Sequence, residues 1–575
     1  MNGSKKMICG MVCALIILLP MLSGCDSVID DAKDIIDNLP DPSDIDWTRE
    51  NPQKLDFNLK DDGTYSVALG SEIYLEKIEI PKTYRGKAVT EIGRFGHEGS
   101  PNLYLEEIII PDSVTTIGER AFEECGSLIS IEIPSSVTSI GNKAFYKCVN
   151  LLKIVIPDSV TRMGYQAFYG CRNLASVQIS QNLSNIEYDS FYGCISLSDI
   201  VIPDGVKSIG SGVFSSCENL KSITISDSVT VIHKEAFYEC LQLDEVVIPD
   251  SVKSFGEGVF ARCSSLKRIT LPFVGRTESL NNSTLRYLFG GEDPRNLNTV
   301  IVTRPDGIGE GAFSNCANIK RVVLPDGITS IPKNAFYNCP KLTDIVIPDS
   351  VTSICDGAFS GCSALESIVI SDGVTRIAKD AFSYCSALTS VVIPDSVTSI
   401  EERAFNGCDA LTSIVIPYSV ASIGDGVFSR CHYLTSITVS PDNPNYKDID
   451  GNLYSKDGKT LVQYAIGKTD ASFAFPREVT SIAPYAFYWC NNLTNIVIPD
   501  GVTSILPYVF CGCTNLTTVV IPDSVTSLGY FAFNDCSITS VKYSGTEAQW
   551  EAISKNVNWD RGSRNYVVTY NYTGE

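Results

Sequence analysis

The chain has 575 residues, of which 44% are hydrophobic and 19% are charged, so it can form a packed core and is a poor candidate for global disorder. Lysine and arginine total 45 against 67 acidic residues, which gives a formal net charge of −22. An acidic chain without a basic block does not suit binding to nucleic acid or anionic lipid through charge. The three histidines, His97, His233 and His432, are too few for a His-rich metal site and disfavour His-based catalysis.

Residues 1–24 have the pattern of a secretion signal. Lys5 and Lys6 precede the almost wholly apolar stretch Met7–Leu22, which is shorter than the about 20 residues that a membrane span needs. The stretch leads into Leu-Ser-Gly-Cys, ending at Cys25, which resembles a bacterial lipobox. In such signals the cysteine thiol is acylated and becomes the mature N-terminus. The alternative is an ordinary signal peptide with a chance cysteine. We predict a lipid anchor at Cys25, with the rest of the chain outside the cytoplasm.

Residues 25–54 are predicted to be an acidic tether. Between Asp26 and Asp46 the chain has eight aspartates and one lysine, with Pro40 and Pro42 among them. Like charges and prolines favour an extended segment.

A repeat of 23 residues runs through residues 101–543. Cysteines recur in one phase, each with Phe three residues before it and nearly always Leu three residues after it. One such unit cannot bury its apolar face alone, so the units must stack and share a continuous core. The in-phase cysteines are Cys125, Cys148, Cys171, Cys194, Cys217, Cys240, Cys263, Cys316, Cys339, Cys362, Cys385, Cys408, Cys431, Cys490, Cys513 and Cys536.

Each unit predicts one coil of an α/β repeat solenoid. The Leu-x-x-Ile-x-Ile stretch alternates and predicts a short strand that pairs in parallel with its equivalent in the next coil. Pro-Asp-Ser or Pro-Asp-Gly then turns the chain, and Val-x-x-Ile is a second short extended piece. Gly-x-x-Ala-Phe-x-x-Cys is expected to close the coil as a tight helical turn. With strands about 4.8 Å apart, about 17 coils give a rod or arc on the order of 80 Å long.

Two insertions interrupt the repeat, at 276–296 and 440–472. The cysteine spacing widens from 23 to 53 residues at the first insertion and to 59 at the second. The first is rich in Asn, Ser and Gly. In the second, Tyr446–Tyr454 and Thr460–Tyr464 predict a hairpin with its turn at Lys456-Asp457-Gly458.

Residues 55–100 are predicted to form an N-terminal cap with a degenerate first coil. The apolar residues of 55–59 are expected to face those of 65–69 across a turn at Asp62-Gly63. Gly93-Arg94-Phe95 then matches a coil that lacks the cysteine. Such a cap is needed because an open solenoid end exposes an apolar face.

Residues 544–575 are predicted to form the C-terminal cap. Thr546 and Gln549 have the spacing of a capping box that opens a helix through Trp550 to Ile553. The alternation of Asn565–Tyr572 predicts a final strand, and Trp550 and Trp559 are the expected core of the cap.

The motif Ile-Pro-x-x-Val-x-x-Ile-x-x-x-Ala-Phe-x-x-Cys resembles the BspA-like leucine-rich repeats of surface proteins from anaerobic bacteria and some protozoa. The resemblance covers about residues 55–575 and implies a leucine-rich-repeat solenoid, in which hairpin insertions are familiar. BspA-like members are described as adhesins for host matrix and plasma proteins and as proteins of bacterial coaggregation. The resemblance therefore implies a binding scaffold.

The cysteine row has three interpretations. Stacked coils place neighbouring cysteines about 5 Å apart, within reach of a disulfide, and secretion permits disulfides. The runs have seven, six and three members, however, so pairing between neighbours leaves orphans. A metal site is the least favoured reading. The favoured prediction is a buried ladder of small apolar thiols, with the off-phase Cys355 more exposed because it replaces the usual Gly.

Aspartates also recur after the proline, as at Asp158, Asp204 and Asp250. A stacked row of carboxylates is a candidate calcium site. Asp is also a common turn residue that bonds its own backbone, and the sequence has no compact Asp-x-Asp-x-Asp loop. The turn role is the favoured reading, and we predict no metal site and no cofactor.

The outward face of the strands is the favoured binding surface. The residue between the two inward apolar positions should point outward, and a valine row with polar neighbours suits a protein partner. The alternative is that Val simply suits an exposed strand. The insertions are the other candidates, because loops on a rigid frame often carry function. The candidate residues are Val323, Val346, Val369, Val392 and Val415, with Arg321 and Asp344 beside them, and Tyr446, Tyr454 and Tyr464 of the second insertion.

No catalytic constellation is present. Gly307-x-Gly309-x-Gly311 lies in a repeat turn and not between a strand and a nucleotide-binding helix. We therefore predict a monomeric, lipid-anchored protein of the bacterial surface that binds a host matrix or bacterial surface protein and is not an enzyme. Capture of glycan or mucin by the same face and a structural spacer without a ligand are the alternatives. Exposed aromatic platforms on a concave face would favour glycan.

Overall fold

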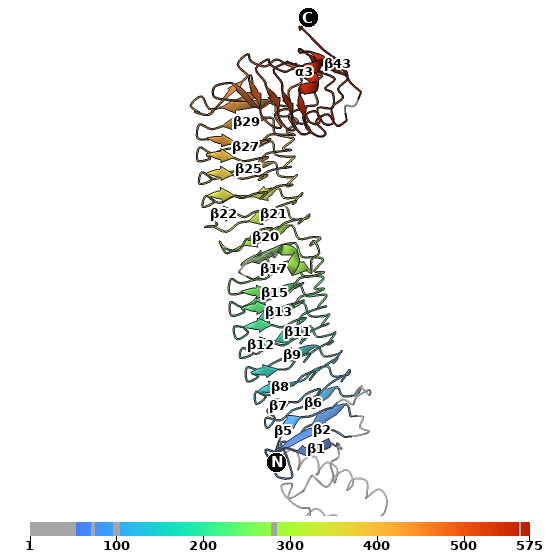
Figure 1. The fold of residues 1–575 in the computed structure, drawn as a ribbon. Helices are drawn as coiled ribbons and strands as arrows, with labels where there is room; N and C mark the ends of the chain where they lie inside the picture. Colours follow the sequence, from blue (N-terminus) through green and yellow to red (C-terminus); the bar gives the residue numbers. More distant parts are fainter. Residues whose placement is uncertain are drawn as a thin grey trace, which may run out of the picture.

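The structure, a computed structural model, describes residues 53, 55–70, 75–95, 104–277, 284–562 and 565–574. These residues form an elongated solenoid of about 21 turns that leans to one side near its C-terminal end (Figure 1). The expected parallel-strand solenoid is confirmed, with more turns than the about 17 predicted, and each of the two insertions contributes one of the additional turns. The signal segment and Cys25 lie outside the described residues.

A first row of strands comes from the Leu-x-x-Ile-x-Ile stretches. Neighbours pair in parallel and in register, as Ser367 with Ser390 and Val369 with Val392. The side chains alternate, so Ile368 is buried whereas Val369 is exposed. The row consists of β3 (Lys77–Glu79), β6 (Glu107–Ile109), β9 (Lys153–Val155), β11 (Ser176–Gln178), β13 (Asp199–Ile202), β15 (Ser222–Ile225), β17 (Glu245–Val247), β19 (Arg268–Leu271), β20 (Thr299–Val302), β21 (Arg321–Val323), β23 (Asp344–Ile345), β25 (Ser367–Val369), β27 (Ser390–Val392), β29 (Ser413–Ile416), β31 (Ser436–Val439), β35 (Ser472–Phe473), β37 (Asn495–Val497), β39 (Thr518–Ile521), β41 (Ser540–Tyr543) and β43 (Val567–Thr569).

A second row comes from the Val-x-x-Ile pieces, whose strands are mostly two residues long. Their apolar residue points inward, as Ile377 and Ile400 do in the paired strands of neighbouring turns. The row consists of β5 (Lys87–Ile92), β7 (Thr116–Ile117), β8 (Ser139–Ile140), β10 (Arg162–Met163), β12 (Asn185–Ile186), β14 (Ser208–Ile209), β16 (Val231–Ile232), β18 (Ser254–Phe255), β22 (Ser330–Ile331), β24 (Ser353–Ile354), β26 (Arg376–Ile377), β28 (Ser399–Ile400), β30 (Ser422–Ile423), β36 (Ser481–Ile482), β38 (Ser504–Ile505), β40 (Ser527–Leu528) and β42 (Ser554–Lys555).

The closing segments form successive tight turns and not helix. In one unit Cys385 N donates to Phe382 O and Leu388 N donates to Cys385 O. Asp380 and Tyr384 have φ values of 54° and 59°, in the left-handed region, so a helix cannot continue on either side of Phe382. Helix is therefore sparse among the described residues, which contain one 3₁₀ helix, η2 (Leu285–Phe289), and one α-helix, α3 (Glu547–Ala552).

The core is a column of stacked phenylalanines with the cysteines beside it. Phe382 is fully buried between Phe359 and Phe405, with ring centroids 5.3 and 5.4 Å away and nearly parallel planes. Within the described residues the cysteines are free and buried, except for the half-buried Cys355. Most of the in-phase thiols donate a hydrogen bond to a main-chain oxygen of the preceding turn, as Cys408 Sγ does to Phe382 O over 3.2 Å. The in-phase cysteines therefore form the buried row of thiols that the sequence favoured.

The two ends of the solenoid carry elements that differ from its regular turns. Strand β1 (Leu55–Leu59) pairs antiparallel with β2 (Tyr65–Leu69), and Phe95 stacks on Phe122 at 5.7 Å as the start of the phenylalanine column. At the other end, Thr546 and Gln549 form the reciprocal capping box of α3. Trp550 and Trp559 are buried, with ring centroids 6.2 Å apart.

The first insertion, within its described part, adds a turn to the solenoid. Leu285, Leu288 and Phe289 are buried, and Phe289 continues the phenylalanine column at 6.4 Å from Phe260. The turn is irregular, since the two rings are tilted by 41°. Residues 278–283 lie outside the described part.

The second insertion is a three-stranded meander of β32 (Tyr446–Ile449), β33 (Asn452–Ser455) and β34 (Thr460–Gln463). Strand β34 pairs in parallel with β36 and so returns the chain to the second row. The buried apolar residues form one core cluster up to Leu453 and another from Tyr454 onward. The C-terminal turns lean away from the rod beyond this point (Figure 1).

The exposed binding role expected for Tyr454 and Tyr464 is wrong. Both side chains are 1% exposed. Tyr464 occupies the place of a phenylalanine in the column, 4.9 Å from Phe487, and its N–H donates to Ala486 O as in a regular turn. The apparent loop tyrosines are core residues because the insertion packs as a solenoid turn.

Candidate binding surfaces

The valine row, defined as Val323, Val346, Val369, Val392 and Val415, comes from five successive turns, at the outward position of the first strand row or, for Val346, directly after it. Four of its members are among the most exposed large apolar side chains, with exposed fractions of 73%, 76%, 72% and 60% for residues 346, 369, 392 and 415. Val323 is half-buried. Strand β21 pairs with β23 and β25 with β27 in register, and the five valines recur every 23 residues, so they follow one another along the outward face.

The polar border of the valine row carries almost no net charge. Arg321 and Asp344 are exposed and form an ion pair of 3.4 Å between neighbouring turns. The same position in the next three turns is an exposed serine, at Ser367, Ser390 and Ser413. The expected outward orientation of these candidate residues is therefore what the structure shows, although their role in binding stays a prediction.

The equivalent positions of the N-terminal turns differ from the valine row. Val155, Val201 and Val247 are 50%, 61% and 54% exposed, but Gln178 and Thr224 separate them. β-propensity alone would account for isolated valines at these positions. The uninterrupted row from 323 to 415 is therefore a feature of the middle turns and not of every turn.

Tyr446 is the one insertion tyrosine that is not fully buried. Its hydroxyl accepts a hydrogen bond from Ile423 N over 2.9 Å. Burial raises the pKa of Tyr446, and that hydrogen bond opposes the shift in part. The side chain therefore fastens the insertion to the preceding turn, which leaves little of it available to a partner.

The cysteines and aspartates have structural roles in this fold. Burial raises the pKa of Cys385 to about 12, so its thiol stays protonated and is a poor metal ligand. Asp158 accepts a hydrogen bond from Gln181 N over 2.8 Å, which is a turn contact between successive coils. Within the described residues no group of three or more His, Cys, Asp or Glu side chains is arranged to hold a metal ion.

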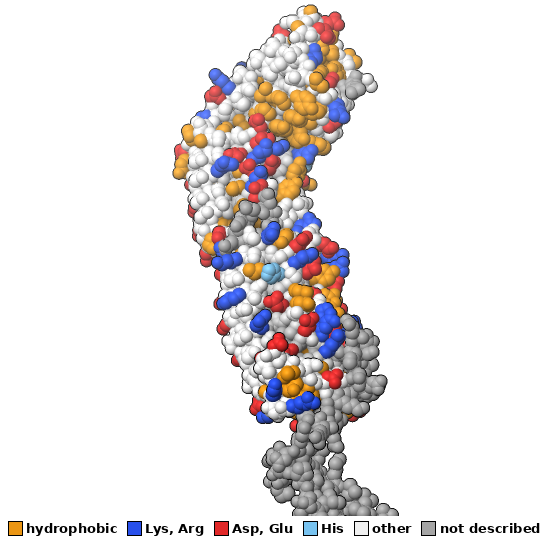
Figure 2. Space-filling view, turned by 60° about the horizontal axis from the view of Figure 1, so that its bottom comes forward, with side chains coloured by type: hydrophobic (Ala, Val, Ile, Leu, Met, Phe, Trp, Pro, Cys, Tyr) orange, Lys and Arg blue, Asp and Glu red, His pale blue; other side chains and the backbone are white. Residues whose placement is uncertain are grey.

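A second surface, which sequence reasoning did not identify, lies on the inner side of the bend. This elbow groove has a volume of about 650 Å³. Its floor is a row of small polar residues from successive turns, Ser360, Ser383, Asn406 and Ser429, and its C-terminal wall is Tyr485, Tyr488 and Tyr508. Figure 2 shows hydrophobic side chains gathered on the inner side of the bend, beside a cluster of charges.

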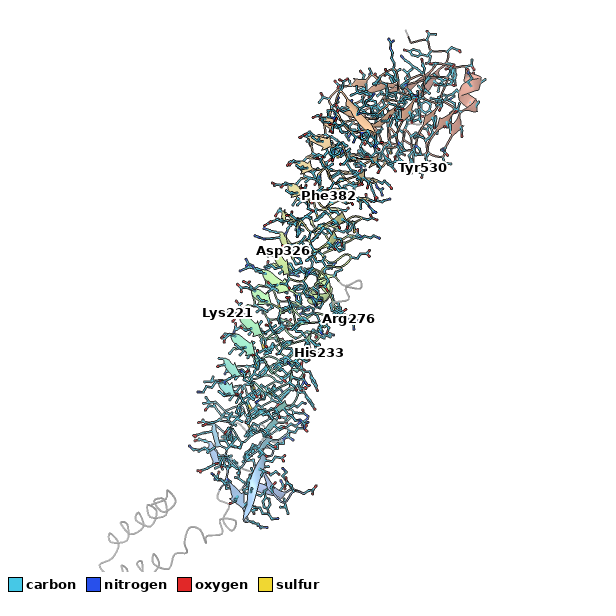
Figure 3. All side chains as sticks on the ribbon, turned by 90° about the vertical axis from the view of Figure 1, so that its left-hand side faces the viewer. Lys221, His233, Arg276, Asp326, Phe382 and Tyr530 are labelled. Atoms are coloured by element: carbon cyan, nitrogen blue, oxygen red, sulfur yellow. The ribbon has the colours of Figure 1, made fainter. Side chains whose placement is uncertain are left out.

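The wall tyrosines form an ordered aromatic cluster. Tyr485 stacks on Tyr508 with centroids 4.9 Å apart and planes within 6°, and Tyr488 stands edge-on to Tyr485 at 5.4 Å. Burial raises the pKa of Tyr485 to about 12, so its hydroxyl stays protonated. Tyr530, in the next turn, lies at the same inner side of the bend (Figure 3).

Arg430 connects the two sides of the elbow groove. Its guanidinium lies 5.4 Å from the ring centroid of Tyr488 and 4.7 Å from that of Trp489, beyond the insertion. The same group donates to the hydroxyl of Tyr384 over 3.1 Å. Gly426, at φ 62°, lies so close to Tyr485 that an added Cβ would come within 3.2 Å of it. These contacts hold the groove in a fixed shape.

The sequence signal for the groove was a change of residue type at fixed repeat positions. The residues two before and one after the column phenylalanine are Gly426 and Ser429 in the last turn before the insertion. In the first regular turn after it they are Tyr485 and Tyr488. The repeat period reveals that small residues are replaced by tyrosines at these positions. It does not reveal that the small residues and the tyrosines line the same groove.

A family model described as "BspA type Leucine rich repeat region (6 copies)" matches residues 90–203, 184–289, 293–411, 353–463 and 471–557. The chain belongs to the BspA-type leucine-rich repeat family. This is a family of surface proteins, consistent with a protein-binding surface protein, and such repeat proteins are typically not enzymes.

Solved structures similar to this BspA-type chain include bacterial leucine-rich repeat proteins. A leucine-rich repeat protein from Bacteroides ovatus is 27% identical over 67% of this chain and 92% of its own, with a TM-score of 0.36. A leucine rich cell surface protein from Faecalibacterium prausnitzii is 24% identical over 87% of this chain and 96% of its own, with a TM-score of 0.31. The pneumococcal vaccine antigen PcpA is 16% identical over 90% of this chain and 96% of its own, with a TM-score of 0.25. A search of curated proteins finds none that matches.

No helix in the described part of the BspA-type chain combines the length and the apolar character needed to cross a membrane.

Proposed function

We propose that this protein is a lipid-anchored adhesin of the bacterial surface that holds a host matrix protein or a surface protein of a neighbouring cell on the valine row. The observation that carries the proposal is the row of valines at one outward position of five successive middle turns, four of which are exposed. The lipobox pattern at Cys25 supports the anchor, and the family supports the surface location.

The chemistry of the valine row suits a protein partner. Protein interfaces have an apolar centre and a polar border, which here are the valines and the flanking serines. Five turns at about 4.8 Å spacing give a row roughly 20 Å long, which can form the apolar centre of an interface that buries about 800 Å² on each side. Strands β25 and β27 pair with each other through their main chains. A partner at this part of the sheet would therefore contact the outward valine side chains and not the main chain of these strands.

The test is binding of a soluble form beginning at Asp26 to immobilised fibronectin, fibrinogen, collagen and mucin. We expect saturable binding to a protein and a loss of at least tenfold in affinity for the double variant Val369→Glu, Val392→Glu, because it places two charges in the apolar centre of the interface. The matched control is Val201→Glu, Val247→Glu, which changes exposed valines at the same strand position where no row exists.

Two results would count against the proposal. If the control double variant weakens binding as much as the row variant, added charge and not the valine row is responsible. If none of the immobilised proteins binds and a preparation of neighbouring bacterial cells also fails to bind, a structural spacer without a ligand accounts for the fold better.

A further inference from the structure

The elbow groove combines a polar floor with an aromatic wall, and we propose that it binds a neutral oligosaccharide of pyranose sugars. This site is distinct from the valine row, since the two occupy different sides of the same turns: Val392 lies in strand β27, whereas Ser383 and Asn406 lie in the closing segments before and after it. The inference goes beyond the proposed protein binding and does not depend on it.

The aromatic wall matches the apolar face of a sugar ring. The axial C–H groups of a pyranose form a flat patch that packs on the face or edge of an aromatic ring. Tyr485, Tyr488 and Tyr508 are each partly exposed and present both faces and edges to the groove. Tyr337 and Tyr384, which are 43% and 49% exposed, also line the groove.

The polar floor matches sugar hydroxyls. Ser429 is 1% exposed, lines the groove, and its hydroxyl has no hydrogen-bond partner among the described residues. Leaving a buried hydroxyl unpaired is unfavourable, and a ligand hydroxyl can both donate to it and accept from it. Asn406 Nδ2 donates to Ser383 Oγ over 3.2 Å, which leaves the amide oxygen of Asn406 free to accept from a ligand hydroxyl.

The spacing of the floor matches a sugar chain. Ser360, Ser383, Asn406 and Ser429 come from successive turns, so equivalent polar groups recur at about the 4.8 Å separation of parallel strands. A β-linked pyranose chain advances by a similar distance with each sugar. One sugar can therefore lie over each turn, with its hydroxyls on the floor.

The charges around the groove favour a neutral ligand. Lys379 is paired with Glu402 over 2.8 Å, and Arg403 is paired with Asp380 over 3.2 Å. Burial raises the pKa of Asp380, while Arg403 opposes that shift. Because acidic and basic groups compensate each other at this surface, neither a strongly cationic nor a strongly anionic ligand has a clear electrostatic advantage.

The groove is formed before any ligand arrives. Arg430 links Tyr384 on one side to Tyr488 and Trp489 on the other. The wall rings are already stacked on each other. A ligand therefore has few side chains to order, which lowers the entropic cost of binding.

The test is isothermal titration of the soluble form beginning at Asp26 with neutral oligosaccharides, namely cellohexaose, xylohexaose and an N-acetyllactosamine hexasaccharide. The first two represent plant polysaccharide and the third represents mucin glycan. We expect saturable binding of at least one of them. Tyr485→Ala and Tyr337→Ala should each weaken it by about five- to tenfold, the size of one lost ring contact.

Tyr169→Ala is the matched control. Tyr169 is also stacked between two tyrosines, at 4.9 Å from Tyr146 and 4.6 Å from Tyr192, but it lies outside the groove. It should leave the affinity unchanged, and so should Val369→Glu. Tyr337 is exposed, so its variant should keep the melting temperature of the parent and report on binding alone.

Three results would overturn the inference: no saturable binding of any neutral oligosaccharide, an equal loss in Tyr169→Ala, or tighter binding of an acidic oligogalacturonate than of every neutral chain. A failure of oligosaccharide binding with intact protein binding, or the reverse, separates this inference from the proposed adhesin function, because Val369→Glu and Tyr485→Ala affect different ligands.

Discussion

Replacement of Phe382 by Ala tests whether the stacked column of phenylalanines is the main stabilising element of the solenoid. Phe382 is fully buried and stacks at 5.3 Å on Phe359 and 5.4 Å on Phe405. Its main-chain oxygen also accepts from the Cys408 thiol, and the substitution keeps that acceptor. The variant therefore removes the ring while leaving the main-chain ladder in place.

The expected cost is about 3–5 kcal/mol, the range for a fully buried phenylalanine replaced by alanine. The side chain fills its place in the stack completely, and the neighbouring rings are held by their own turns, so the cavity can collapse only in part. In a solenoid the loss falls on the interfaces with both neighbouring turns. We therefore expect the free energy of unfolding of the middle turns to fall more than that of the caps.

Denaturant unfolding monitored by circular dichroism measures the total change, and hydrogen exchange of the turns from Phe359 to Phe405 locates it. Long repeat arrays do not always unfold in one step, so the exchange measurement is needed alongside the denaturation curve. The control is Tyr433→Ala. Tyr433 is 67% exposed, and its loss should change the free energy of unfolding by less than about 0.5 kcal/mol.

A change of less than about 0.5 kcal/mol for Phe382→Ala would refute the reasoning. It would mean that the ring does not occupy a packed column and that the inward register of the closing segments is wrong. Protection lost only at the terminal caps would contradict the nearest-neighbour argument.

Two further predictions concern the anchor and the thiols. Cys25→Ala should move the protein from the membrane fraction to the soluble fraction on cell fractionation, and a variant that stays membrane-bound would contradict the lipobox prediction. Burial raises the pKa of Cys217, Cys385 and Cys431 from an ordinary 9.0 to about 12. The folded chain therefore keeps protons that the unfolded chain releases, so the contribution of these thiols to stability is fully present below pH 9 and is lost as the pH rises from 9 towards 12. Denaturation curves between pH 8 and pH 11 measure this fall in stability. Alkylation of the native protein at pH 8 should modify the half-buried Cys355 before the buried cysteines, and rapid alkylation of Cys385 in the native state would contradict the burial of the thiol row.

The repeat period was sufficient to predict the turn of the solenoid. Ile368 and Phe382 had to point inward because no single unit can bury its apolar residues alone. The outward position of Val369 follows from the alternation of a strand, and Thr546 with Gln549 follows from local capping chemistry. Each of these features depends on contacts within one turn or between identical turns.

The insertions could not be predicted in this way. Tyr454 and Tyr464 appear in a segment without the repeat, so they look like exposed loop residues in the sequence. In the structure Tyr464 stacks on Phe487 and replaces a phenylalanine of the column. The segment forms a solenoid turn and not a loop because it packs against β36 and its neighbours. No local sequence pattern predicts that packing.

By itself the sequence determined the repeating turn, the buried thiol row and the outward valines, because a period of 23 residues applies the same packing constraint to every unit. Only the tertiary structure decided where the rod bends and that Ser429 and Tyr485 line the same groove. These residues are 56 positions apart and belong to turns on opposite sides of an irregular insertion. Their approach depends on the tilt with which the insertion stacks, and that tilt is set by the packing of the whole insertion and not by any one motif.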